Sequence, residues 1–183
     1  MLRLDRTTTM STVLNPMRWS WRSCCFAGFL VCVALLAYAL YVQFELNLQP
    51  CPLCILQRIA FMIMAVLFLL GALHAPRARG RWGYVGPLVL AALAGAGVAA
   101  RHLWLQLQPP NPFGSCGAPL NYMIDNLPLT EVVRKVFIGS GDCAVVDWRF
   151  LGMPMPFWTL LWYLLLGAWA LWATRSAIRG RVR

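Results

Sequence analysis

The stretch Cys51-Pro52-Leu53-Cys54, followed four residues later by Arg58, opens a long apolar run over residues 59–73. Two cysteines separated by two residues form a redox-active dithiol or half of a metal site. An apolar segment of about 17–25 residues is long enough to cross the hydrocarbon core of a bilayer. The stretch therefore predicts a reactive thiol pair at a membrane surface, with a cation just inside the apolar segment.

The composition agrees with a membrane protein. Of the 183 residues, 60% are hydrophobic and only 12% are charged, whereas soluble domains carry roughly 25% charged residues. The net charge of +10 is typical of nucleic-acid-binding proteins too. Here, however, the basic residues lie in short clusters between apolar runs, as topology determinants do. We therefore expect no nucleic-acid partner.

Four apolar segments predict an all-α fold, a four-helix transmembrane bundle that forms a single domain over residues 1–183. The third segment contains Gly86, Gly95 and Gly97, which permit close contacts between helices. We expect the helices at about residues 24–42, 55–73, 84–103 and 157–174.

The arginines predict the orientation of the bundle. Eleven of the sixteen basic residues fall on one side if four helices alternate in direction; they are Arg3, Arg6, Arg18, Arg22, Arg77, Arg79, Arg81, Arg175, Arg179, Arg181 and Arg183. The positive-inside rule assigns that side to the cytoplasm. The tails, 1–23 and 175–183, are then cytoplasmic. The loops at about 43–54 and 104–156 lie in an oxidising compartment.

A cleavable signal peptide is the competing interpretation of the N-terminus. Arg18 and Arg22, the apolar stretch and Ala37-Tyr38-Ala39 fit its pattern. Cleavage would leave three helices, which cannot keep both later arginine clusters in the cytoplasm. We therefore prefer an uncleaved first helix.

The seven cysteines divide according to this topology. Cys24, Cys25 and Cys32 lie in the first helix, where we expect small buried hydrophobic residues without a redox role. The other four lie on the oxidising side, where disulfides persist; they are Cys51, Cys54, Cys116 and Cys143.

The spacing of these four cysteines argues against a metal site. Cys116 and Cys143 are 27 residues apart instead of forming a second CxxC pair. A purely structural disulfide that closes the long loop remains an open alternative for Cys116 and Cys143. It is a weak alternative for Cys51 and Cys54, because so small a ring restrains little of the chain.

The proline residues around the CxxC predict a helix start. Pro50 and Pro52 favour a helix that begins near Cys51 to Cys54, where the positive end of the helix dipole favours a thiolate. Arg58 would share a helix face with both cysteines. An arginine one turn inside an apolar segment is costly and usually functional, although snorkelling to the headgroups is the alternative.

The long second loop and the two histidines complete the pattern. Apolar residues at helical spacing over 127–137 predict a short amphipathic helix on the membrane surface. His74 and His102 stand at opposite ends of the predicted bundle, so they cannot ligate one haem iron together. His102, with Arg101, is on the side of the CxxC and is a candidate for binding a polar headgroup.

Taken together, these motifs closely resemble the bacterial disulfide bond formation protein B family, DsbB, nearly from the first helix to the fourth. The resemblance is carried by Pro50-Cys51-Pro52-Leu53-Cys54, Arg58, Gln106-Leu107, Pro112-Phe113, Cys116, Ser140-Gly141-Asp142-Cys143, Trp148, Phe150-Leu151-Gly152 and Met155-Pro156. The central Pro52-Leu53 pair differs among members of the family, and the segment 1–17 is longer than is usual in it.

The resemblance implies a thiol:quinone oxidoreductase of the inner membrane, with both termini cytoplasmic and its redox loops periplasmic. Cys116 and Cys143 match the pair that oxidises a periplasmic thioredoxin-fold partner of the DsbA type, with Cys116 forming the mixed disulfide. Cys51 and Cys54 match the pair that passes electrons to ubiquinone or menaquinone. Cys54 and Arg58 match the quinone-site residues, and no metal is required.

Two other functions remain as rivals. A non-catalytic membrane scaffold with two structural disulfides would use the same four cysteines. A quinone reductase of the vitamin K epoxide reductase type is also a small helical bundle with a CxxC pair. That type usually carries its CxxC on a later helix, whereas here the CxxC comes first.

Overall fold

Four long helices form the computed structural model, which describes residues 20–45, 50–77, 79–108, 126–128, 130–131 and 149–179. The helices are α2 (Trp21–Glu45), α3 (Pro52–His74), α4 (Trp82–Leu107) and α7 (Met155–Arg179). Two short strands, β1 (Arg149–Phe150) and β2 (Met153–Pro154), pair as an antiparallel hairpin directly before α7. All four helices are long and apolar enough to cross a membrane, as the sequence predicted.

Each helix extends further at both ends than the apolar run that predicted it. In α2 the helix continues through Gln43 to Glu45, and in α4 it continues through Gln106. Gln43, Glu45 and Gln106 are polar, so a hydropathy pattern does not include them. A helix nevertheless continues past the hydrocarbon core into the polar headgroup region.

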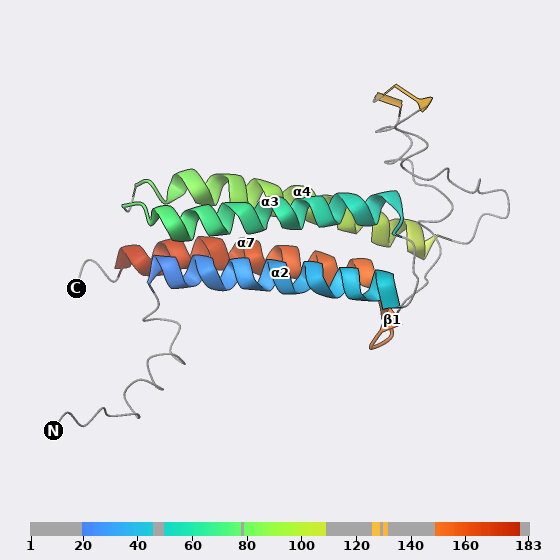
Figure 1. Ribbon diagram of the computed structural model, residues 1–183, viewed down its shortest axis with the longest axis horizontal. Coiled ribbons are helices and arrows are strands. Elements are labelled where there is room, and N and C mark those ends of the chain that lie inside the picture. Colours follow the sequence, from blue (N-terminus) through green and yellow to red (C-terminus); the bar gives the residue numbers. More distant parts are fainter. Residues whose placement is uncertain are drawn as a thin grey trace.

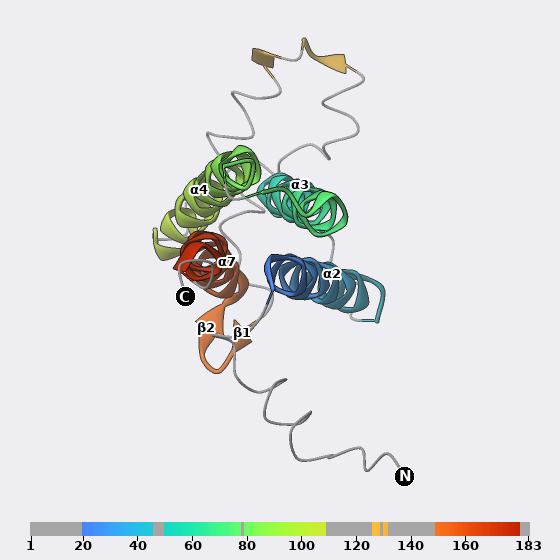
Figure 2. The ribbon, with the colours of Figure 1, turned by 90° about the vertical axis from the view of Figure 1, so that its left-hand side faces the viewer.

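The helices form an antiparallel bundle (Figures 1 and 2). Along the chain α2 packs on α3, α3 on α4 and α4 on α7, and α7 closes the ring with a smaller contact to α2. The start of α2, the end of α7 and the turn between α3 and α4 lie at one end of the bundle (Figure 1). The start of α3 and the β1–β2 hairpin lie at the other end.

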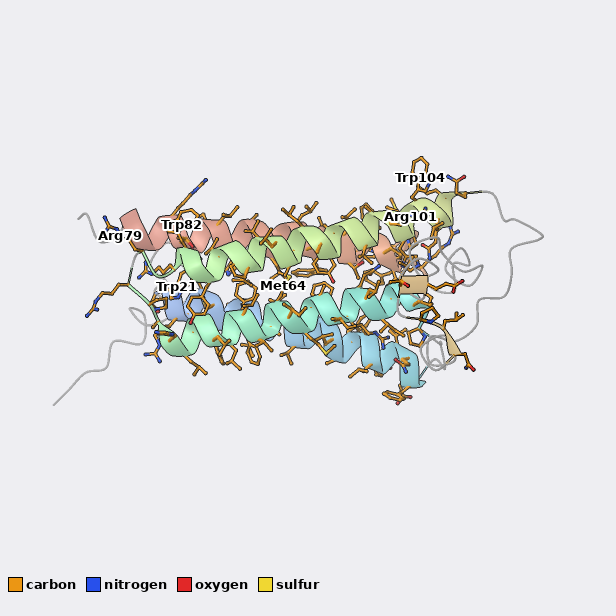
Figure 3. All side chains as sticks on the ribbon, turned by 90° about the horizontal axis from the view of Figure 1, so that it is seen from above. Trp21, Met64, Arg79, Trp82, Arg101 and Trp104 are labelled. Carbon is orange, nitrogen blue, oxygen red and sulfur yellow. The ribbon has the colours of Figure 1, made fainter. Side chains whose placement is uncertain are left out.

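Arginine and tryptophan side chains lie at both ends of the bundle (Figure 3). Arg79, Trp21 and Trp82 lie at one end, and Arg101 and Trp104 at the other (Figure 3). Large apolar side chains cover the outer faces between these ends; they include Leu30, Ile63, Val66, Leu90, Leu93 and Leu164. An apolar belt with tryptophans near both edges is the pattern that a bilayer selects.

The centre of the bundle is built around Tyr163 of α7, which is fully buried. Its ring stacks on Phe61 of α3 with centroids 4.2 Å apart, and its hydroxyl donates to the backbone carbonyl of Gln57 at 2.6 Å. Gly95 of α4 makes room for this ring, because a Cβ there would lie 2.5 Å from it. The single side chain of Tyr163 therefore fixes α3, α4 and α7 together.

The predicted role of glycine in close helix contacts is correct for Gly95 and wrong for the other two. A Cβ at Gly86 or Gly97 would meet nothing within 4 Å. Composition alone cannot distinguish a glycine that faces a neighbouring helix from one that faces outward.

The three cysteines of α2 are buried among apolar side chains, as predicted. Cys24, Cys25 and Cys32 are at most 2% exposed and belong to the main core cluster. Cys25 lies against α3, where its Sγ would be 3.3 Å from a Cβ at Gly71. These thiols therefore serve as small packing groups between α2 and its neighbours.

Candidate functional site

The CxxC pair lies at the first turn of α3. Cys51 is the N-cap residue and Pro52 the first helical residue, which confirms the predicted helix start. Cys51 Sγ accepts a hydrogen bond from the backbone N–H of Cys54 at 3.4 Å. The two Sγ atoms lie 3.0 Å apart, in contact but without a covalent bond. The positive end of the α3 dipole therefore faces both sulfur atoms.

His102 of α4 lies beside this pair. Its Nε2 atom is 3.8 Å from Cys51 Sγ, and the side chain is only 3% exposed. Gln106, one turn further along α4, places its Nε2 atom 3.4 Å from the same ring nitrogen. The sequence placed His102 on the side of the CxxC; the fold brings it into contact with the thiol itself.

Gln57 holds the other side of the His102 ring. Its amide nitrogen lies 3.2 Å from Nδ1 of His102, and its amide oxygen accepts a hydrogen bond from the Thr159 hydroxyl at 2.8 Å. Gln57 is 5% exposed. A polar network with the buried side chains of His102 and Gln57 at its centre joins Cys51 and Thr159, and it connects α3, α4 and α7 at one level of the bundle.

Sequence reasoning missed Gln57 and Thr159 as site residues. For Gln57 the signal was present, because it is a polar side chain inside an apolar helix, next to Arg58. For Thr159 there was none, since threonine is common in membrane helices and its partner is 102 positions away in the chain.

Arg58 points toward α2. Its guanidinium donates to the side-chain oxygen of Gln43 and, at 3.1 Å, to the backbone carbonyl of Ala39. Within the described part of the chain, both of its hydrogen bonds therefore go to α2. Arg58 fixes the end of α2 against the first turns of α3, beside the CxxC pair.

An apolar pocket of about 280 Å³ lies among α2, α3, α7 and β1. Aromatic rings dominate its lining, among them those of Tyr38, Phe61, Trp158 and Trp162. The pocket also reaches Ala39, whose carbonyl binds Arg58, and Thr159, whose hydroxyl binds Gln57. Two hydrogen-bonded contacts thus link the pocket wall to residues on the first turns of α3.

The second cysteine pair, Cys116 and Cys143, lies outside the described residues. Most of the amphipathic helix expected over 127–137 also lies outside them. Of the predicted site residues, the structure brings Cys51, Cys54 and His102 together. Arg58 lies on α3, on the side of that helix that faces α2. Cys51, Cys54 and His102 also present three ligand atoms within 4.8 Å of one another.

The chain matches a family of known membrane proteins over most of its length. Residues 21–173 match the family model described as "Disulfide bond formation protein DsbB". A disulfide bond formation protein B of Xanthomonas euvesicatoria pv. vesicatoria is 51% identical over 170 residues, which cover 92% of this chain and 99% of that protein.

Two further relatives carry the same description. The protein of Xanthomonas axonopodis pv. citri is 53% identical, with 92% of this chain and 99% of that protein covered. The protein of Xylella fastidiosa (strain 9a5c) is 44% identical over 154 residues, which cover 84% of this chain and 89% of that protein. The chain therefore belongs to the DsbB family of disulfide bond formation proteins, and it is a multi-pass membrane protein whose described residues include four helices long enough to span a membrane.

Proposed function

We propose that the chain is a thiol:quinone oxidoreductase of the bacterial inner membrane. It reoxidises a periplasmic thioredoxin-fold oxidase of the DsbA type and passes the electrons to ubiquinone or menaquinone. In this orientation both termini and the Arg77–Arg81 turn are cytoplasmic, and both cysteine pairs are periplasmic. The observation that carries the proposal is the hydrogen-bonded connection between the Cys51–Cys54 dithiol and an aromatic pocket inside the bundle.

The proposed thiol chemistry is a series of exchanges between pairs. A thiolate of the reduced partner attacks the Cys116–Cys143 disulfide and forms a mixed disulfide with Cys116. The second partner thiol resolves it, so that two electrons and two protons pass to Cys116 and Cys143. This dithiol then reduces the Cys51–Cys54 disulfide in the same way, since each step needs only a thiolate near a disulfide sulfur.

The pocket suits the ring of a quinone. Tyr38, Trp158 and Trp162 offer aromatic faces to a flat apolar ring, and Thr159 adds one hydroxyl to the lining. A bound quinone would supply the two-electron, two-proton acceptor that the Cys51–Cys54 dithiol needs.

His102 and the helix dipole give the dithiol its reactivity. Cys51 Sγ accepts the backbone N–H of Cys54 at the positive end of the α3 dipole. When the Gln57 amide turns so that its oxygen accepts from Nδ1–H of His102, Nε2, at 3.8 Å from Cys51 Sγ, is positioned to take the thiol proton. Gln57 holds the opposite ring nitrogen and so fixes the plane of the imidazole. Arg58 keeps the α2 wall of the pocket in place through Ala39.

The test uses purified protein, a reduced thioredoxin-fold partner and ubiquinone, with partner oxidation as the readout. We expect wild-type protein to oxidise the partner catalytically, and Cys54→Ala and Cys116→Ala to abolish turnover. Cys32→Ser, which alters a buried packing thiol, is the matched control and should retain activity. Wild-type rates in both Cys54→Ala and Cys116→Ala would refute the relay and favour a structural role for the disulfides.

A further inference from the structure

The CxxC pair and His102 have the chemistry of a zinc site. Two thiolates and one imidazole are ligands that Zn²⁺ prefers, and three protein ligands with an open fourth position are a common arrangement around this ion. The three ligand atoms lie within 4.8 Å of one another. CxxC spacing alone did not predict this site, because the third ligand is 48 positions beyond Cys54 in the sequence and comes from another helix.

The distances are close to those that zinc requires. With Zn–S bonds of about 2.3 Å and a Zn–N bond of about 2.0 Å in tetrahedral geometry, the sulfur atoms lie about 3.8 Å apart and sulfur and nitrogen about 3.5 Å apart. Here the two Sγ atoms are 3.0 Å apart, and Cys51 Sγ is 3.8 Å from Nε2 of His102. Admitting the ion would require the two sulfur atoms to separate by about 0.8 Å through rotation of a cysteine side chain.

The surroundings of His102 also fit a zinc ligand. A zinc-bound histidine usually donates its second ring N–H to a fixed acceptor. Gln57 stands at Nδ1 and is 95% buried, and its amide can turn over to present its oxygen there. The Thr159 hydroxyl can pair with the Gln57 amide in either orientation, because a hydroxyl both donates and accepts hydrogen bonds. The site would be electrically neutral, since two thiolates balance the charge of the ion.

We infer that the reduced Cys51–Cys54 pair and His102 bind one Zn²⁺ ion, and that this binding holds the pair in its dithiol state. Each cysteine loses its proton to water, two Zn–S bonds and one Zn–N bond form, and no electrons move. The disulfide form cannot bind, because it has no thiolate to offer. Zinc would therefore inhibit turnover reversibly. Only this last consequence rests on the proposed function.

Zinc binding is best measured on full-length protein with Cys116→Ser and Cys143→Ser, because the second pair could bind the ion on its own. The reduced protein in detergent is titrated with Zn²⁺ against a chromophoric chelator. We expect one ion per chain. His102→Ala and Cys51→Ser should each weaken binding by at least about tenfold, whereas His74→Ala, at the opposite end of the bundle, should bind as the parent does.

The oxidised protein gives a comparison that needs no further substitution. With Cys51 and Cys54 joined in a disulfide, we expect no stoichiometric Zn²⁺ binding. Equal binding by the oxidised and reduced forms, unchanged affinity in Cys51→Ser, or no binding by the reduced form would each overturn the inference. Partner oxidation measured without metal tests the proposed function separately. Loss of zinc binding and loss of oxidoreductase activity can therefore be told apart.

Discussion

Gln57 is the residue on which the local geometry of the site depends most. Its amide bridges His102 and Thr159, and its backbone carbonyl accepts from Tyr163. A buried side chain that makes hydrogen bonds to two other helices fixes their relative rotation as well as the imidazole ring. Gln57 therefore acts as a positioning residue for His102.

Removing the polar end of Gln57 should impair the chemistry more than the fold. In Gln57→Leu the Thr159 hydroxyl keeps the Pro156 carbonyl as a partner at 3.0 Å, but His102 loses its support. Misplacing a catalytic group by about 1 Å costs up to about 100-fold in rate, so we expect reoxidation of the dithiol to slow by about 10- to 100-fold.

The control for this prediction is Gln57→Glu, whose carboxylate can accept from both His102 and Thr159. Stopped-flow measurement of reoxidation across a pH series should show recovery of the rate in Gln57→Glu, with a changed pH profile. Equal rates and equal pH profiles in Gln57→Leu and wild type would contradict a positioning role.

At the scale of the helices, α4 and α7 approach closely at Gly95. A Cβ at this position would lie 2.5 Å from the Tyr163 ring, whereas a Cβ at Gly97 would meet nothing within 4 Å. The two glycines therefore form a matched pair on one helix, one that faces a neighbour and one that does not.

Alanine at these two positions should have opposite effects on stability. Gly95→Ala overpacks the Tyr163 ring and should destabilise the bundle by about 1–3 kcal/mol. Gly97→Ala should be neutral or stabilising by up to about 1 kcal/mol, because alanine favours the helix. Thermal unfolding in detergent measures both; equal melting temperatures for the two variants would refute the packing account.

The pocket between α2 and α7 can be tested through Ala39. Ala39 lines the pocket, whereas Ala37, two residues earlier on α2, is exposed on the outer face. Ala39→Phe should fill part of the volume of about 280 Å³ and raise the KM for quinone by at least about tenfold, since a displaced ring loses its contacts. Ala37→Phe should leave the KM for quinone unchanged. The measurement is the rate of turnover as a function of quinone concentration. A filled pocket with an unchanged KM would locate the quinone elsewhere.

At the scale of the whole molecule, hydropathy and arginine patterns predicted the class of fold, the number of helices and their antiparallel order. They did not predict which helix faces meet. His102 is 45 positions after Gln57 in the sequence, and Thr159 is 57 positions after His102. Apolar runs carry no information about the rotation of a helix around its axis, so they do not predict that these side chains meet. The pocket was missed for the same reason, since its lining comes from three helices and a hairpin.

The proposed orientation predicts the location of every connection. Reporter fusions after Arg183 and within the turn at Gly80 should be active in the cytoplasm, and a reporter inserted within residues 109–125 should be active in the periplasm. The physical reason is the concentration of arginines at one end of the bundle. Periplasmic activity of the Gly80 reporter would invert the topology and remove both cysteine pairs from the oxidising compartment.

The proposed function depends on the delivery of electrons from the Cys51–Cys54 dithiol to a quinone. The most direct measurement uses reduced protein with Cys116→Ser and Cys143→Ser, mixed with ubiquinone in the absence of any partner. We expect one Cys51–Cys54 disulfide and one quinol to form per chain, with no quinol in the same protein carrying Cys54→Ala. A dithiol that stays reduced in the presence of excess quinone would contradict the account.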